Sequence, residues 1–184
     1  RGKIKGHKTF ICKYEQDTIP KGCFLDVNTV IHLAAYSKDV GKFDERLKKK
    51  YFNFNHYKTL ELADASIKLK IKNFIFVSSS KAMRYSNVNN INSVTDYGSL
   101  KRYTEHKLIK KFENTGLNLK ILRFPVMYGP NMRNNLNLMR TAIRYGLFPN
   151  FPEINNKRQL IHIDDVIRSI YFMMKNSEKK TIYY

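Results

Sequence analysis

The sequence predicts an α/β fold built around a parallel sheet. Short runs rich in β-branched and aromatic residues alternate with amphipathic helical stretches along the chain. One of these runs, residues 29–35, is apolar at nearly every position, which is typical of a strand buried on both faces. With 184 residues and 42% hydrophobic content, the chain is long enough to bury one real core. The alternation therefore favours a parallel sheet covered by helices.

The first half of the chain contains three strand candidates and one long helical stretch. Residues 8–13 form the first strand candidate, and residues 29–35 form the second. A long amphipathic stretch over residues 43–70 predicts a helical region. The third strand candidate, residues 73–78, is apolar and ends in serines.

The second half repeats this alternation. A helix is predicted over residues 93–112, and its inward positions are expected to be Leu100, Tyr103, Leu108 and Phe112. A strand over 119–124 follows, and then helices over 136–145 and 164–174. In such sheets ligands bind beyond the carboxyl ends of the strands, which is where Ala34, Ala35, Ser79 and Pro125 fall.

Two segments together indicate a redox active site. The apolar run at 74–77 ends in Ser78, Ser79 and Ser80, and Tyr97 lies four residues before Lys101. Residues four apart share one helical face, so the ammonium is expected to lie near the phenol. A nearby positive charge favours the phenolate, which would let a tyrosine act as a general base well below its usual pKa of about 10. A serine at the end of a buried strand can hydrogen-bond the same substrate hydroxyl.

The Tyr-x-x-x-Lys spacing is a weak signal by itself. The chain is rich in both residues, and a solvated helix face explains most such matches. The strand that ends in serines upstream makes the catalytic interpretation considerably stronger.

The chain is strongly basic, with a formal net charge of +19 and a pI near 9.9. Such a charge raises nucleic-acid or acidic-membrane binding as a hypothesis. The lysines are, however, spread through the whole chain, and the nearest cluster, residues 46–50, is typical of a solvated helix end. We therefore expect no nucleic-acid partner, while a phosphate-bearing ligand would benefit from the positive field.

Cysteine content and hydropathy indicate a cytoplasmic protein. Cys12 and Cys23 show no metal-ligand spacing and indicate neither a disulfide framework nor a metal site. No apolar run approaches the roughly 20 residues that cross a bilayer. The basic start, residues 1–5, lacks the apolar region of a signal peptide. A reducing compartment and no membrane partner are expected.

Five ordered motifs resemble one known family. They are VIHLAA at 30–35, FVSS at 76–79, Tyr97-x-x-x-Lys101, LRFPVMYGP at 122–130 and RQLIHIDDV at 158–166. In this order they resemble the NAD-dependent epimerase/dehydratase family, the extended short-chain dehydrogenases that act on nucleotide sugars. The resemblance implies a Rossmann-like parallel sheet with helices on both faces.

The resemblance also implies roles for individual residues. Tyr97 matches the catalytic base, Lys101 its partner and a ligand of the nicotinamide ribose, and Ser79 the catalytic Ser/Thr that contacts substrate, with Ser80 as the alternative. Further matches to the cofactor site are Leu33, Ala34, Ala35, Asn55, Pro125 and Val126. Further matches to the substrate site are Asn135 and Arg158.

Several of these matches have competing interpretations. Core packing explains Leu33 as well as cofactor contact does, and Asn55 resembles any polar helix residue. The alignment of Asn135 is ambiguous across residues 134–137, and a surface salt bridge competes for Arg158. His162 and the pair Asp164 and Asp165 are expected to be structural, with Asp164 or Asp165 capping the following helix.

By resemblance the chain is a nucleotide-sugar epimerase that uses NAD, with NADP left open, and takes a UDP-linked substrate similar to UDP-glucose or a UDP-N-acetylhexosamine. Family dehydratases carry Asp-Glu where this chain has Ser80 and Lys81, which disfavours dehydration. A nucleotide-sugar 4-ketoreductase or dehydrogenase, a non-catalytic relative and a homodimer all stay open.

The chain departs from the family at both ends. It contains no opening strand followed by a Gly-x-x-Gly-x-x-Gly turn, the segment that holds a pyrophosphate. It also stops at Tyr184, before the rest of the family's substrate-binding portion. We therefore expect residues 1–130 to form a partial NAD-binding domain that carries Ser79, Tyr97 and Lys101. Residues 131–184 are expected to form part of an interleaved substrate-binding region.

Overall fold

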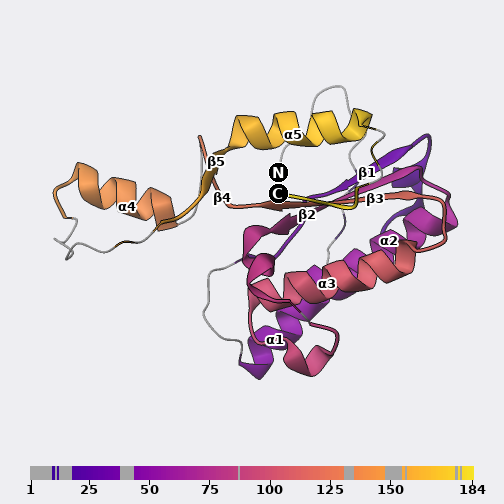
Figure 1. Cartoon of the computed structure of the whole chain (residues 1–184), viewed down its shortest axis with the longest axis horizontal. Helices are drawn as coiled ribbons and strands as arrows, with labels where there is room; N and C mark the ends of the chain where they lie inside the picture. The colour runs from indigo at the N-terminus through magenta and orange to yellow at the C-terminus, as the bar shows by residue number, and fades with distance from the viewer. Residues whose placement is uncertain are drawn as a thin grey trace.

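A four-stranded parallel sheet in the order β1–β2–β3–β6 lies at the centre of the fold (Figure 1). Its strands are β1 (Thr29–His32), β2 (Asn73–Ser79), β3 (Asn118–Phe124) and β6 (Ile182–Tyr183). A second parallel pair is formed by β4 (Val126–Tyr128) and β5 (Leu160–His162). The computed structural model describes Phe10, Cys12, residues 18–37, 44–86, 88–130 and 135–147, Asn155, residues 157–176, Glu178 and residues 180–184. The predicted α/β fold with a parallel sheet is confirmed.

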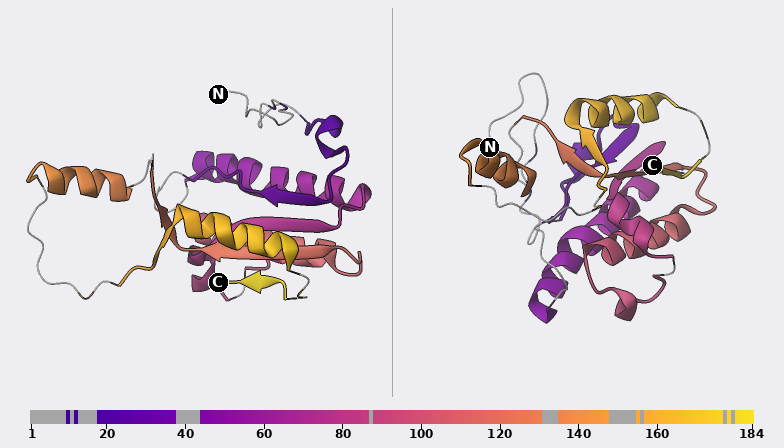
Figure 2. Two further views of the ribbon diagram at one scale, coloured as in Figure 1. Left: turned by 90° about the horizontal axis from the view of Figure 1, so that it is seen from above. Right: turned by 60° about the vertical axis from the view of Figure 1, so that its left-hand side comes forward.

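Helices cover both faces of this sheet. Figures 1 and 2 show α2 and α3 on one face and α5 on the other. The helices are α1 (Glu45–Phe52), α2 (Lys58–Lys68), α3 (Tyr97–Phe112), α4 (Asn135–Arg144) and α5 (Ile163–Lys175). A π-helical turn, η2 (Asn53–Tyr57), joins α1 to α2, so the predicted helical stretch over 43–70 is confirmed with one irregular turn inside it. The described residues also include three short 3₁₀ turns: η1 (Lys21–Phe24), η3 (Ser80–Arg84) and η4 (Ile91–Ser93).

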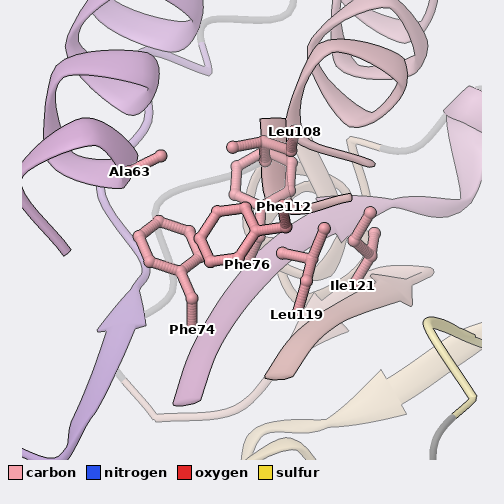
Figure 3. Close-up of a cluster of buried hydrophobic side chains, with 7 residues drawn as sticks. All are labelled: Ala63, Phe74, Phe76, Leu108, Phe112, Leu119 and Ile121. Atoms are coloured by element: carbon pink, nitrogen blue, oxygen red, sulfur yellow. The ribbon is translucent and has the colours of Figure 1, made fainter. Parts of the chain in front are cut away.

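The alternation of side chains along β2 and β3 builds two apolar layers. On the face of α2 and α3, one cluster gathers the side chains drawn in Figure 3: Ala63, Phe74, Phe76, Leu108, Phe112, Leu119 and Ile121. On the opposite face, Ile75, Leu122 and Phe124 pack with Val166 of α5. The sheet is therefore the middle layer of three.

The predicted inward face of the helix that begins at Tyr97 is confirmed. Leu100, Tyr103, Leu108 and Phe112 are all buried. The segment 93–96 precedes the helix, because the chain makes the short turn η4 there and Asp96 caps α3. None of the helices in the described ranges is both long enough and apolar enough to span a bilayer.

The prediction for residues 29–35 is wrong in two respects. The strand ends at His32, and it is not buried on both faces, since Ile31 is 36% exposed and Leu33 is 60% exposed. The reason is that β1 is an edge strand of the described sheet, and Ile31 lies outside the apolar cluster that α5 covers. Of the predicted strand over 8–13, all but Phe10 and Cys12 lies outside the described residues.

Candidate active site

The carboxyl ends of β1, β2 and β3 lie at the same edge of the sheet because the three strands are parallel. The residues that follow them are Leu33, Ala34 and Ala35 after β1, Ser80 after β2, and Pro125 and Val126 after β3. Leu33 and both alanines are exposed, as is Val126 at 37%. This edge therefore presents small and apolar side chains at strand ends, where an α/β sheet binds its ligands.

A capping box fixes the start of α3 and with it the position of Tyr97. The Asp96 carboxylate accepts a hydrogen bond from the backbone N–H of Ser99 at 2.8 Å, and the Ser99 hydroxyl oxygen accepts one from the backbone N–H of Asp96 at 3.0 Å. The Tyr85 hydroxyl donates to the same carboxylate at 2.6 Å. These bonds make Tyr97 the first residue of the helix.

Gly98 brings this helix start against the turn that follows Ser79. A Cβ at Gly98 would lie 2.8 Å from the Lys81 carbonyl oxygen and 3.0 Å from the Tyr85 ring. No side chain fits in that space, so α3 and η3 touch through their backbones. The close approach holds Tyr97 near the end of β2.

Lys101 is buried at the same place, with 2% of its surface exposed. Its Nζ donates to the Val77 carbonyl oxygen at 3.0 Å and lies 4.4 Å from the centre of the Phe76 ring and 5.8 Å from that of Tyr97. Burial lowers the pKa of Lys101 to about 8, while the charge of Glu105 acts in the opposite direction.

The expected lowering of the Tyr97 pKa is wrong for the chain alone. Burial, followed by the neighbouring Tyr51, raises the Tyr97 pKa above its usual value. The two rings meet edge to face with centroids 6.2 Å apart. The ammonium of Lys101 points at the Val77 carbonyl instead of the phenol oxygen, so desolvation of the phenolate outweighs the attraction. Within the described residues the Tyr97 hydroxyl forms no hydrogen bond.

Ser79 is the last residue of β2 and caps η3. Its hydroxyl oxygen accepts a hydrogen bond from the Lys81 N–H at 3.2 Å, which leaves the hydroxyl proton available to donate. Ser80, the alternative assignment, is the first residue of η3. Ser79, Tyr97 and Lys101 are thus brought to one corner of the sheet by β2 and α3.

Asn55 lies in the π-helical turn η2 and is 1% exposed. Its side-chain amide clamps the backbone of Tyr36: it accepts from the N–H at 2.7 Å and donates to the carbonyl at 2.8 Å. Single π-turns inside helices are frequent at functional sites. Asn55 therefore fixes the path of the chain directly after Ala35.

Asn135 and Arg158, the two predicted substrate residues besides Ser79, lie on other elements of the chain. Asn135 begins α4, which Figures 1 and 2 show well away from α3, and its side chain is outside the described structure. Arg158 is exposed, two residues before β5. The structure does not bring Asn135 to the corner that holds Tyr97.

The predicted cap of α5 is wrong. The capping residue is His162, whose ring nitrogen Nδ1 accepts from the Asp164 N–H at 3.3 Å. Asp164 and Asp165 occupy the first turn, where carboxylates interact favourably with the positive end of the helix dipole. No group of three or more potential metal ligands occurs within the described ranges.

One group of interacting residues next to the site was not predicted from the sequence. Glu105, one turn after Lys101, is fully buried and binds Arg123 of β3 and the hydroxyl of Ser78. A glutamate on the inward face of an amphipathic helix, together with an arginine inside a buried strand, was the available signal.

The chain is similar in sequence to known proteins. A family model described as "NAD dependent epimerase/dehydratase family" matches residues 17–184. A UDP-glucose 4-epimerase from Vibrio cholerae is 25% identical over 151 residues, which are 77% of this chain and 46% of that protein.

Solved structures show the same fold. A UDP-glucuronic acid 4-epimerase from Bacillus cereus, in complex with UDP-glucuronic acid and NAD, aligns with a TM-score of 0.72 at 22% identity over 88% of this chain and 55% of that one. A UDP-glucose 4-epimerase with UDP-glucose from Thermotoga maritima aligns with a TM-score of 0.70 at 23% identity over 89% and 57%. The chain thus spans about half the length of these relatives.

Proposed function

This chain belongs to the NAD dependent epimerase/dehydratase family, and we propose that it is part of a nucleotide-sugar 4-epimerase that uses NAD and a UDP-linked sugar. The observation that carries this proposal is the meeting of Ser79, Tyr97 and Lys101 at the carboxyl edge of the sheet. The relatives described above are 4-epimerases of UDP-sugars, which supports the choice of reaction and substrate.

The proposed cofactor site consists of the strand ends and the corner residues. Leu33, Ala34, Ala35, Pro125 and Val126 offer a small, apolar surface along the edge, and Asn55 holds the first of these segments in place. Lys101 uses one ammonium proton on Val77, so two protons can bind a ribose hydroxyl. The donors and the apolar edge fit a dinucleotide, with NADP as the alternative to NAD. A bound NAD would supply the hydride acceptor for the sugar carbon and the donor for its return.

The proton chemistry falls to this chain's own residues. Tyr97 as phenolate takes the proton of the sugar hydroxyl when the carbon–hydrogen bond breaks, and gives it back when that bond reforms on the opposite face. Ser79 donates its free hydroxyl proton to the same substrate oxygen. Burial opposes the phenolate. The ammonium of Lys101, 5.8 Å from the centre of the Tyr97 ring, is proposed to supply positive charge to the phenolate in the complex with cofactor and substrate.

Substrate binding involves residues outside this corner. Arg158 is proposed to grip the diphosphate, a task suited to a planar guanidinium that forms two parallel hydrogen bonds. Asn135 is proposed to contact the nucleotide. The net charge of +19 favours any ligand that carries a diphosphate.

In this proposal residues 1–130 contribute to the NAD-binding domain and residues 131–184 to the substrate region. A cytoplasmic location and a homodimer are part of the same proposal. A nucleotide-sugar 4-ketoreductase would use the same three catalytic residues, and it differs in that NAD(P)H is consumed.

The test uses the longest native polypeptide that contains these residues. It is incubated with NAD and, separately, UDP-glucose, UDP-glucuronic acid and UDP-N-acetylglucosamine, and the products are identified by proton NMR. A 4-epimer formed without net NADH supports the epimerase, oxidation of added NADH with a 4-keto sugar supports the reductase, and no reaction with any of them counts against both.

A pair of variants makes this test specific. Tyr97→Phe removes the proposed base and is expected to lower kcat about 100- to 10,000-fold. Tyr103→Phe removes a hydroxyl from a buried tyrosine on the same helix and is expected to leave kcat near that of the parent. Equal activity of Tyr97→Phe and the parent would refute the role of Tyr97.

A further inference from the structure

Glu105 is a buried carboxylate that accepts hydrogen bonds from several side chains. Its side chain is fully buried, and its two carboxylate oxygens receive the Ser78 hydroxyl at 2.5 Å, Arg123 Nε at 3.0 and 3.2 Å, and Arg123 Nη2 at 2.5 Å. Arg102 reaches the same carboxylate at 3.5 Å. Arg123 is 6% exposed, and its third nitrogen, Nη1, donates to the Tyr184 hydroxyl oxygen at 3.2 Å.

These bonds join three elements at the catalytic edge. Ser78 and Arg123 lie opposite each other in the register of β2 and β3, and Glu105 of α3 binds both of them from the sheet face that α2 and α3 cover. The residue after Ser78 is Ser79, and the residue one turn before Glu105 is Lys101. Two of the groups that Glu105 binds, Ser78 and Arg102, are therefore sequence neighbours of the proposed catalytic residues Ser79 and Lys101.

A buried ion pair is a poor device for stability alone. Removing two charges from water costs about as much as their attraction returns, and apolar residues of similar volume often replace such pairs without loss. The same face of β3 is apolar beside the pair, since Ile121, two residues before Arg123, is fully buried in the cluster with Leu108. The directional bonds, and not the burial, distinguish Glu105 from a leucine at the same position.

We propose that Glu105 is a positioning residue for catalysis, an inference that rests on the proposed function. Paired with Arg123, its carboxylate fixes the ends of β2 and β3 against α3, so that Ser79 lies close to Tyr97 and Lys101. The carboxylate touches neither the substrate nor the cofactor in this proposal. It acts through Ser78 and through the helix turn that leads to Lys101.

The charge of Glu105 also acts on Lys101. Burial lowers the Lys101 pKa to about 8, and Glu105 is the neighbour that raises it. The other ionisable groups that face Lys101 are Tyr97 on the same helix and His32 on β1, whose own pKa is lowered first by burial and then by the charge of Lys101. Loss of the Glu105 charge is expected to favour the neutral amine, which cannot stabilise a phenolate.

The test neutralises both partners in the longest native polypeptide that contains this chain. The double variant Glu105→Gln with Arg123→Gln removes both members of the ion pair together, so that neither is left unpaired, and keeps polar side chains in place; it is therefore expected to fold. Thermal unfolding, kcat, the KM for the sugar nucleotide and the affinity for NAD are measured. The Lys101 ammonium is titrated by NMR of 13Cε-labelled lysine, assigned with Lys101→Arg. The matched control, Asp64→Asn, removes the carboxylate of an exposed pair between α2 and Lys111 of α3.

A positioning role predicts a specific split. The double variant is expected to unfold near the parent temperature, to lose about 100-fold in kcat with a KM changed by less than about threefold, and to titrate Lys101 at lower pH. Asp64→Asn is expected to change none of these. Parent values of kcat and of the Lys101 titration in a folded double variant would overturn the proposal, because the pair would then be merely structural.

Two further outcomes are decisive as well. If the double variant does not fold, Ser78→Ala removes one bond and keeps the ion pair: a several-fold loss of kcat at unchanged stability supports the proposal, and an unchanged kcat overturns it. If the parent epimerises no sugar nucleotide, the proposed function fails, but the role of Glu105 can still be tested by the Lys101 titration and the affinity for NAD. A change of both quantities in the double variant supports a positioning role for Glu105, and no change in either overturns it.

Discussion

The close contact at Gly98 makes Gly98→Ala the sharpest probe of the site's construction. The added methyl would lie 2.8 Å from the Lys81 carbonyl oxygen, and ordinary contact begins at 3.4 Å, so the helix start or η3 must yield by about 0.6 Å. Both neighbours are constrained, since Lys81 belongs to the turn capped by Ser79 and the Tyr85 ring is held by Asp96. Relief of the clash therefore moves Tyr97 away from the end of β2.

Two effects on stability oppose each other in this variant. Alanine in place of glycine in a helix gains about 1 kcal/mol, whereas overpacking of a tight contact costs about 1–3 kcal/mol. We expect a net loss of about 1 kcal/mol in the free energy of unfolding, measured by urea denaturation. The effect on kcat is expected to be larger, up to about 100-fold, because the displacement separates the proposed catalytic groups Ser79 and Tyr97.

The control for this experiment is Gly22→Ala. Among the described residues its methyl would meet only the ring of Phe10, at 3.3 Å, and that side chain is 47% exposed. That variant is expected to keep the parent's kcat. If Gly98→Ala matched the parent in both stability and kcat, the tight contact between α3 and η3 would have no part in positioning Tyr97.

Two other predictions concern buried polar groups. His32 and His56 bond Thr59 and Thr104, and burial lowers their pKa values to about 3 and about 4. In the unfolded chain both histidines bind a proton below about pH 6.5, whereas in the folded chain His56 does so only near pH 4 and His32 only near pH 3. The free energy of unfolding therefore falls as the pH drops below 6.5, by at most about 1.4 kcal/mol per pH unit for each histidine. Urea midpoints between pH 7 and 4 test this, and His56→Gln is expected to flatten the curve. Lys120, 2% exposed, donates to the Met173 and Asn176 carbonyls at the end of α5. Lys120→Met is expected to cost about 1–3 kcal/mol in urea denaturation, whereas Lys111→Met on the surface costs less than about 1 kcal/mol, and equal losses would contradict the capping role.

Periodicity predicted the elements and the core well because both follow from local pattern. The inward face of α3 was predicted by residues three, four and five positions apart, and each of them is buried. The limits of β1 were not predictable in this way. Whether Ile31 is covered depends on which strand lies at the edge of the sheet, a matter of tertiary arrangement that a run of apolar residues does not contain.

The corner of Ser79, Tyr97 and Lys101 was predictable because sequence spacing and strand direction bring these residues together. Their electrostatics were not. The sign of a pKa shift depends on the balance of desolvation against charge, and that balance is set by which atom the Lys101 ammonium faces. The cap of α5 shows the same limit, since a ring nitrogen of His162 took the position expected for a carboxylate.

The burial that shapes this corner acts against both members of the Tyr97 and Lys101 pair. It raises the pKa of the phenol and lowers that of the ammonium, so it favours the neutral form of each. Proximity on one helical face therefore does not by itself produce a base. A charge that keeps Lys101 protonated is needed, and Glu105, one turn further along α3, is the group that supplies it. On this reasoning the glutamate and the tyrosine belong to one functional unit: removal of the distant carboxylate should weaken the base through the lysine between them.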